Sequence, residues 1–422
     1  MLVLYLYFKN ICLLDELSSG FLYLIHWQRS DAQKTTIGRA CRNILNEMIA
    51  DSMPVSTTLD SKRWQTVLQL VHQLVEPAEL PAVSLCVGVA DRLERRHAEG
   101  RFDSMSASDN ATVTPDTPFL VASLTKPVTV MAVMMLVERG LIRLNDRISD
   151  TISSMNLPDK NSIRIRHLMS HTSGLPDMLP DNDQLRAAHA PLSKFIEKIG
   201  SCELLFEPGT GVSYQSMGTA LLAELVQQVS GQKIGDFVKS EIFDPLGMNA
   251  TRLGVTGDDA RKVARIRISK EQSATNWNWN SPYWLGLGAP WGGMTSTASD
   301  LGRLARLFLG GGVVGRTRLL SNQSVALMST SQMDGYTRLA DDDRRLNTWG
   351  LGWRVFGAGV GTNLGELLSP QAFGHHGATG TLMWMDPSRA AYAVILTTRP
   401  YDQSGPILMK LSNAISAAFV SE

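Results

Sequence analysis

Ser123 and Lys126 form the residue pair whose types and spacing best suit chemistry in this sequence. Residues three apart lie on one face of a helix, so the lysine amine can reach the serine hydroxyl. A serine becomes a nucleophile when a neighbour removes its proton, and burial reduces a lysine's preference for its charged form. The almost entirely apolar run 128–137 predicts a central helix, in which a lysine needs a partner or a function. Ser123 is therefore predicted as a nucleophile and Lys126 as its base or proton relay.

Tyr214 is the second candidate, 91 positions after the serine in the loop-like, glycine-containing stretch 206–216. A phenol loses its proton at about pH 10, but a nearby ammonium such as that of Lys126 would stabilise the phenolate. Two interpretations stay open. The tyrosine is a proton-transfer group beside the nucleophile, or it is simply packed against the protein.

The third candidate is the segment Phe373–Gly380 (FGHHGATG), which is typical of a strand edge with glycines. Glycine lets a substrate backbone approach a strand closely, and the backbone N–H of Ala378 could join that of Ser123 in an oxyanion hole. His375 and His376 would point to opposite faces of the strand. One of them is expected at the site and the other packed or solvated, so a metal pair is not expected.

These three elements resemble the SxxK, YxN and KTG/HxG motifs of the class C β-lactamases and related penicillin-recognising hydrolases. Further stretches are similar to segments of that family: Arg166–Pro176 (RHLMSHTSGLP), Trp291–Leu301 (WGGMTSTASDL) and Gly350–Trp353 (GLGW). The resemblance runs from about Trp64 to the C-terminus.

The resemblance implies a role for each matching residue. Ser123 would be the nucleophile, Lys126 its partner, Tyr214 the general base and His375 the substrate-facing residue of the third motif. Substrate or oxyanion contacts would come from His375, Gly377, Ala378 and Ser216. The resemblance also implies that His171, in the HTSG segment, is structural.

Two departures from the family pattern matter. Ser216 stands where an asparagine is usual, so a shorter hydroxyl replaces a side-chain amide. His375 stands where true β-lactamases have lysine, and a neutral imidazole is a poorer anchor for a carboxylate than an ammonium. An antibiotic-resistance role is therefore not expected, and the HxG variant resembles esterases, D-amino-acid peptidases and acyl-transferring members.

Aromatic residues crowd the segment before Gly292, and two interpretations of them are equally open. They line an apolar acyl pocket, or they pack the two lobes of the protein together. The residues are Trp277, Trp279, Tyr283, Trp284 and Trp291.

The pattern of apolar residues predicts the elements that must position these side chains. Helices are expected over 61–75, 128–137, 219–229, 298–309 and 406–420, and strands over 82–90, 93–100, 348–356, 373–377, 381–385 and 392–398. The region from about 145 to 291 predicts a mostly helical lobe. The expected fold is α+β, an antiparallel sheet flanked by helices with this lobe inserted, of the β-lactamase/transpeptidase type.

Composition narrows the possible partners. Forty basic and forty acidic residues cancel, so no nucleic-acid partner is expected. The four cysteines have no zinc-like spacing, and neither a metal nor a cofactor is expected. The stretch Gly310–Gly315 formally matches GxGxxG, but it follows a helical pattern, so a turn is predicted there instead of a dinucleotide site.

Residues 1–58 are predicted to form a leader outside the catalytic domain, 59–422. The apolar start is interrupted by Lys9 and Asp15, which argues against a membrane span, and it lacks a signal-peptide cleavage pattern. The leader is interpreted as a poorly ordered extension, an amphipathic anchor or sequence upstream of the true start at Met48 or Met53. A cytoplasmic location is expected.

The sequence thus predicts a serine hydrolase that acts through a covalent acyl-enzyme on a small ester or amide. One alternative is a non-catalytic member of the family that binds a ligand or self-assembles, and another is an acyltransferase. The substrate and the oligomeric state are not predicted.

Overall fold

The structure is a computed structural model that describes residues 57–90, 92–103, 111–357 and 363–421. Residues 57 and 58, which the sequence analysis assigned to the leader, belong to strand β1 (Thr57–Leu59), which pairs with β13 (Phe419–Ser421). The remainder of the predicted leader lies outside the described residues.

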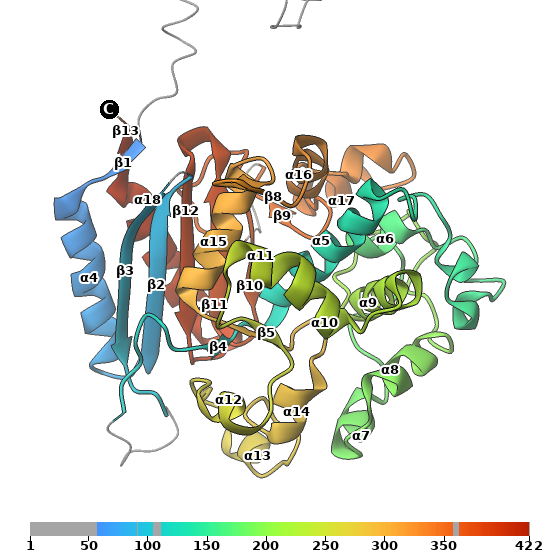
Figure 1. Cartoon of the computed structure of the whole chain (residues 1–422), viewed down its shortest axis with the longest axis horizontal. Coiled ribbons are helices and arrows are strands. Elements are labelled where there is room, and N and C mark those ends of the chain that lie inside the picture. Colours follow the sequence, from blue (N-terminus) through green and yellow to red (C-terminus); the bar gives the residue numbers. More distant parts are fainter. Residues whose placement is uncertain (1–56, 91, 104–110, 358–362, 422) are drawn as a thin grey trace, which may run out of the picture. The chain divides into compact units, whose positions relative to one another are not determined.

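A six-stranded antiparallel sheet forms the framework, with the strand order β3-β2-β12-β11-β10-β9. Its strands are β2 (Ala82–Val89), β3 (Arg92–Gly100), β9 (Arg354–Val355), β10 (Phe373–Gly377), β11 (Thr381–Asp386) and β12 (Ala391–Thr397). The early strands β2 and β3 therefore lie beside the late ones in one sheet (Figure 1), as the sequence predicts.

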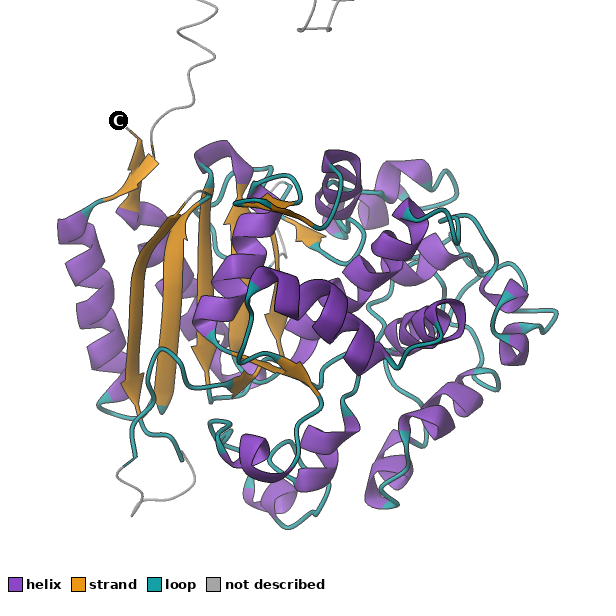
Figure 2. Ribbon diagram, in the orientation of Figure 1, coloured by secondary structure: helices purple, strands orange, loops and turns teal. Residues whose placement is uncertain are grey.

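Each face of the sheet has its own apolar core, because alternate residues of a strand point to opposite sides. Val83 and Leu85 of β2 pack with helices α4 (Ser61–Val75) and α18 (Tyr401–Ala418). Cys86 faces the other way, towards α15 (Ala298–Leu309), where a side chain at Gly302 would collide with its sulfur. Helices thus cover both faces (Figure 2), which confirms the predicted α+β class.

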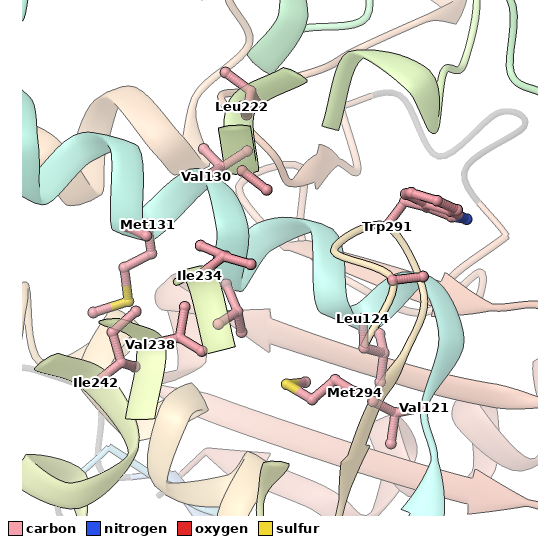
Figure 3. Packing of buried hydrophobic residues seen from close by; sticks show 14 of the residues in the cluster. Val121, Leu124, Val130, Met131, Leu222, Ile234, Val238, Ile242, Trp291 and Met294 are labelled. Carbon is pink, nitrogen blue, oxygen red and sulfur yellow. The ribbon is translucent and has the colours of Figure 1, made fainter. Parts of the chain in front are cut away.

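The central helix is α5 (Thr125–Glu138), and almost every side chain on it is buried. It packs against α9 (Met217–Ser230) and α10 (Ile234–Val238). Figure 3 shows Val130 and Met131 of α5 near residues of these helices. A helix that is apolar on every side is expected only inside a protein, so the sequence predicted this position correctly.

The inserted lobe is mostly helical, as predicted. Its other helices are α6 (Ile165–Met169), α7 (Asn182–Ala187), α8 (Leu192–Ile199), α11 (Asp244–Leu246), α12 (Gly257–Arg261), α13 (Lys270–Ser273) and α14 (Pro282–Leu287). A small sheet of β4 (Phe119–Leu120), β6 (Met294–Ser296) and β5 (Arg252–Leu253) joins it to the segment just before Ser123.

Short elements complete the chain after α15. They are β7 (Val313–Val314), β8 (Thr317–Arg318), α16 (Asn322–Ser329) and α17 (Asp341–Leu346). The glycines at 310–312 end α15 and lead into the β7–β8 hairpin, so the predicted turn is confirmed. No helix within the described ranges has both the length and the apolar composition that a bilayer span requires.

Two predicted elements differ from the observed ones. Of the strand expected over 348–356, only Arg354–Val355 is a strand, because Gly352 has a positive φ and Gly350 N–H donates to the Trp353 carbonyl in a tight turn. The last helix begins at Tyr401, before Pro406, and ends at Ala418, where the chain turns into β13.

Candidate active site

Ser123 lies in a single 3₁₀ turn, Ala122–Leu124, between β4 and α5. Ala122 has φ of 46°, a left-handed conformation that is costly for a residue with a side chain. Thr125 holds the turn, because its Oγ1 donates to the Ala122 carbonyl at 2.6 Å and accepts from Met294 N–H at 3.1 Å. The serine is therefore fixed at the mouth of the central helix.

Lys126 is directed at this serine, with its Nζ 3.1 Å from Ser123 Oγ. Nζ also donates to the Trp291 carbonyl at 3.0 Å, and the side chain is only 2% exposed. Burial lowers the pKa of Lys126 to about 7, and the Asp177 carboxylate acts in the opposite direction. At neutral pH a large fraction of this amine is unprotonated and able to accept a proton.

Tyr214 packs its ring beneath Lys126, with Nζ 4.5 Å from the ring centroid. Burial raises the pKa of Tyr214 above its ordinary range, although a hydrogen bond to Ser123 acts in the opposite direction. The phenolate predicted from a neighbouring ammonium is thus not favoured here, because desolvation raises the pKa of the phenol more than the hydrogen bond to Ser123 lowers it. Tyr214 is therefore a neutral phenol beside Ser123.

The loop that carries Tyr214 is fastened to the HTSG segment. Ser213 N–H donates to the His171 carbonyl at 3.0 Å, and Gln215 N–H donates to His171 Nδ1 at 3.2 Å. Ser173 also hydrogen-bonds to the Gln215 side chain. His171 has a positive φ and is buried against the rings of Tyr214 and Trp349, which lowers its pKa well below the ordinary histidine value.

Threonines in the β10–β11 turn and at the start of β11 connect this hairpin to the segment just before Ser123. Thr379 Oγ1 donates to the Leu120 carbonyl at 2.6 Å and Thr381 Oγ1 to the Val121 carbonyl at 2.9 Å. A side chain at Gly377 would overlap the Val121 carbonyl oxygen, so only glycine permits this approach. The structure thereby brings Ala378 into the same cleft as Ser123.

The two histidines of β10 occupy different environments. His375 is 2% exposed and lies beside the rings of Tyr214 and Trp349. Its Nδ1 is 2.6 Å from the His376 carbonyl, so Nδ1 carries the hydrogen and Nε2 is a buried acceptor with no hydrogen-bond partner among the described residues. His376 lines the cleft and stacks on Tyr401, although His375 was the one expected to face the substrate.

The Ser216 hydroxyl is hydrogen-bonded to the carboxylate of Asp177, a residue that was not predicted to belong to the site. Its Oγ donates to Asp177 Oδ1 at 2.6 Å, and its backbone N–H donates to the same oxygen at 2.9 Å. The Ser216 side chain is buried and is not part of the cleft wall. The predicted substrate contact from Ser216 therefore has no support in this geometry.

A cleft of about 560 Å³ opens over Ser123. Its lining includes Ser123, Tyr214, Trp279, Trp349, Arg354, His376, Ala378, Tyr401 and Asp402. Of the five crowded aromatic residues, Trp279 lines the cleft, whereas Trp284 and Trp291 are buried in the core. Packing in the core thus accounts for Trp284 and Trp291, and an acyl pocket stays a prediction that Trp279 alone of these three is placed to serve.

Arg354 is a cleft residue that sequence reasoning missed. Its guanidinium carbon is 5.3 Å from the Trp349 ring centroid, and its buried Nε has no hydrogen-bond partner among the described residues. It forms no ion pair with a carboxylate in the described part of the chain. The sequence feature that could have indicated this cleft residue is the position of the arginine directly after the GLGW segment.

Known proteins share both the sequence pattern and the fold. A "Putative D-alanyl-D-alanine carboxypeptidase" of Escherichia coli O157:H7 is 26% identical over 386 residues, which cover 84% of this chain and 86% of that protein. A penicillin-binding protein homologue from Caulobacter crescentus superposes with a TM-score of 0.69 at 19% identity, covering 86% of this chain and all of that one.

A second solved structure, EstCE1, described as a hydrolase with promiscuous acyltransferase activity, gives a TM-score of 0.69 at 19% identity over 84% of this chain and 98% of its own. These structural similarities establish the shared fold. The sequence profile of the family described as Beta-lactamase matches residues 67–413. With the match spanning the sheet, the helical lobe and the cleft, the chain belongs to the Beta-lactamase family.

Proposed function

We propose that this protein is a serine hydrolase in which Ser123 forms a covalent acyl-enzyme with an ester or amide. The observation that carries the proposal is the 3.1 Å approach of Lys126 Nζ to Ser123 Oγ inside a buried site that opens onto a cleft. Burying a lysine beside a serine costs free energy unless the pair has a use. Proton transfer between them is that use.

In the acylation step, Lys126 takes the proton of Ser123 while Oγ forms a bond to the substrate carbonyl carbon. The negative charge on the carbonyl oxygen is held by the backbone N–H groups of Ser123 and Ala378. When the bond to the leaving group breaks, Tyr214 gives its proton to the departing nitrogen or oxygen and receives one from Lys126. Water then attacks the ester by the reverse proton path, which releases the acid and restores Ser123.

The test is labelling with a fluorophosphonate probe and turnover of an activated short-chain ester, with Ser123→Ala in parallel. The expected result is one adduct on Ser123, located by peptide mass spectrometry, and turnover that disappears in the variant. A folded protein without adduct or turnover would refute the proposal in favour of a ligand-binding or assembly role. Added alcohols or amines in the same assay separate hydrolysis from acyl transfer.

Arg354 favours a second, narrower function, the hydrolysis of peptides next to a free carboxylate. His375 is neutral, because burial and nearby positive charge lower its pKa well below the ordinary value, so it supplies no charge for a carboxylate. Arg354 supplies that charge in the same cleft, and a guanidinium matches a carboxylate in two-pronged geometry. The carboxypeptidase name of the Escherichia coli relative agrees with this assignment.

A pair of peptides ending in a D-residue, one with a free carboxylate and one amidated, tests the narrower function. The wild type should prefer the free carboxylate, and Arg354→Gln should lose about tenfold to a hundredfold of kcat/KM on that peptide alone, the cost of a lost charge-assisted hydrogen bond. Equal losses on both peptides would show that Arg354 does not read the carboxylate.

A further inference from the structure

We propose that Tyr401 is a positioning residue that holds Ala378, so that the Ala378 N–H stays free to bind the oxyanion in the cleft. The inference rests on the proposed function for its catalytic meaning, but the contacts on which it depends can be measured without any turnover. Tyr401 is the first residue of α18 and lines the cleft together with Ser123 and Ala378.

Ala378 lies where the main sheet no longer fixes the chain. The pairing of β10 with β11 ends at Gly377, opposite Thr381, and Ala378 begins the turn between the two strands. Gly380 N–H donates to the Gly377 carbonyl at 3.0 Å, which closes the turn without a hydrogen bond to Ala378. The orientation of the Ala378 peptide groups therefore has to come from outside this hairpin.

Tyr401 makes two contacts with the hairpin from the start of α18. Its backbone N–H donates to the Ala378 carbonyl at 2.9 Å. Its ring stacks on His376, with the ring centroids 4.2 Å apart and the ring planes at 27°. Rotation of the Ala378 carbonyl would break the hydrogen bond. The N–H of the same residue, which is joined to that carbonyl through one Cα atom, is thereby limited to few directions.

The N–H groups of Ala378 and Ser123 have no hydrogen-bond partner within the described part of the chain. Both residues line the same cleft, and Ala378 is exposed there. Backbone N–H groups that lack a protein partner bind water or a ligand instead. Oxyanion donors are effective because they are held in place before the reaction begins. The contact with Tyr401 gives Ala378 a fixed carbonyl and leaves its N–H free, as an oxyanion donor requires.

The competing explanation is that Ala378 serves the helix and not the reverse. The first N–H groups of a helix have no partner within it, and the Ala378 carbonyl satisfies one of them. In that case loss of the hydrogen bond lowers the thermal stability of the protein and leaves the reaction at Ser123 unchanged. The proposal instead predicts a slower reaction, because charge on the substrate oxygen is held less well.

The experiment replaces Tyr401 by its α-hydroxy acid, 4-hydroxyphenyl-lactic acid, through amber suppression in the full chain. The exchange turns the N–H into an oxygen and keeps the ring on His376. Tyr283 is the matched control, because it also follows a proline in the first turn of a helix, but its N–H has no hydrogen-bond partner among the described residues. Each protein is assayed with an activated ester and with its thionoester, in which sulfur, a weak hydrogen-bond acceptor, replaces the carbonyl oxygen.

The exchange at Tyr401 should lower kcat on the ester by about tenfold, part of the 10²–10³ that a lost oxyanion donor costs, with KM nearly unchanged. The thionoester should lose less, so the ratio of ester to thionoester turnover falls, whereas the exchange at Tyr283 leaves this ratio as in the wild type. An unchanged ratio at Tyr401, or an equal fall at both positions, would overturn the proposal. If the exchange at Tyr401 prevents folding, Tyr401→Ala decides, because it removes the ring from His376. Its ratio should fall by less, and a wild-type ratio there would overturn the proposal.

The hydrogen bond itself is followed by NMR in the same proteins. Alanine labelled with ¹³C at the carbonyl, together with ¹⁵N-threonine, marks only the four Ala–Thr pairs of the sequence, and the Ala378 signal is the one lost in Thr379→Ser. Its carbonyl shift should change in the Tyr401 exchange and stay constant in the Tyr283 exchange. A changed shift in a protein whose Ser123 neither labels nor turns over substrate would refute the hydrolase function alone. Labelling of Ser123 with an unchanged shift would refute the role of Tyr401 alone.

Discussion

Lys126 Nζ lies between the Ser123 hydroxyl, 3.1 Å away, and the face of the Tyr214 ring, whose centroid is 4.5 Å away. The amine is thus placed to exchange a proton with the serine while the tyrosine stays protonated. Burial separates the two groups by pushing the pKa of the lysine down and that of the tyrosine up. In the proposed reaction this separation favours the lysine as the base and the tyrosine as the proton donor.

Acylation of Ser123 should therefore rise with pH through about 7, the pKa of Lys126. The neutral fraction of the amine grows about tenfold per pH unit below its pKa and levels off above it, and the rate follows that fraction. The second-order rate constant of fluorophosphonate labelling, measured against pH, tests this expectation. A rate that keeps rising to about pH 10 would show an ordinary, solvated lysine.

Gly377→Ala should abolish labelling of Ser123. The added methyl group would overlap the Val121 carbonyl oxygen and push β10, with Ala378, away from the nucleophile turn. Loss of one oxyanion donor alone costs about 10²–10³ in rate. Gly335→Ala is the control, because its new methyl group meets no atom within 4 Å. Labelling at the wild-type rate in Gly377→Ala would contradict the assignment of β10 to the site.

Trp279→Ala should weaken the binding of esters with long acyl chains. Trp279 lines the cleft, and removing an aromatic wall costs roughly one to two kcal/mol of apolar contact, or about tenfold in kcat/KM. Acetyl esters, which do not reach the wall, should be hydrolysed as before. A series of acyl lengths on this variant and on Trp277→Ala, which lies outside the cleft wall, provides the comparison. Equal effects of both variants at every length would exclude an acyl pocket at Trp279.

The protein should lose stability between about pH 6.5 and pH 4 through its buried histidines. Burial lowers the pKa of His167 to about 4 in the folded state, from 6.5. As pH falls through this window the unfolded chain takes up a proton that the folded chain refuses, so the free energy of unfolding decreases. Thermal melting at several pH values should show a shallower slope for His167→Asn than for the wild type. Parallel slopes would mean that His167 does not contribute.

Much of the fold was predictable because the signals were local. The β-rich run 82–90 and the almost entirely apolar run after Lys126 each indicate one element, and the structure contains both. The strand expected over 348–356 failed because Gly352 has a positive φ and its N–H donates to the Met169 carbonyl at 2.9 Å, and neither feature is visible as a sequence pattern.

The candidate site was predictable where residue type alone sets the chemistry, as for Ser123 and Lys126. Asp177 and Arg354 were missed because the fold, and not the local sequence, brings Asp177 to Ser216 and Arg354 into the cleft. Asp177 lies 39 positions before Ser216, and no spacing rule connects them. The roles of His375 and His376 likewise depended on which face of β10 meets the cleft, which the sequence left open.

The order of strands in the main sheet also has a consequence for biosynthesis. Strands β2 and β3 leave the ribosome early, but the neighbour of β2 is β12, which is made some three hundred residues later (391 − 89 = 302). Until then, one edge of the β2–β3 hairpin is open to wrong pairing. Assembly of the sheet must therefore wait for nearly complete translation, and only then does Ala378 reach the cleft that Ser123 lines.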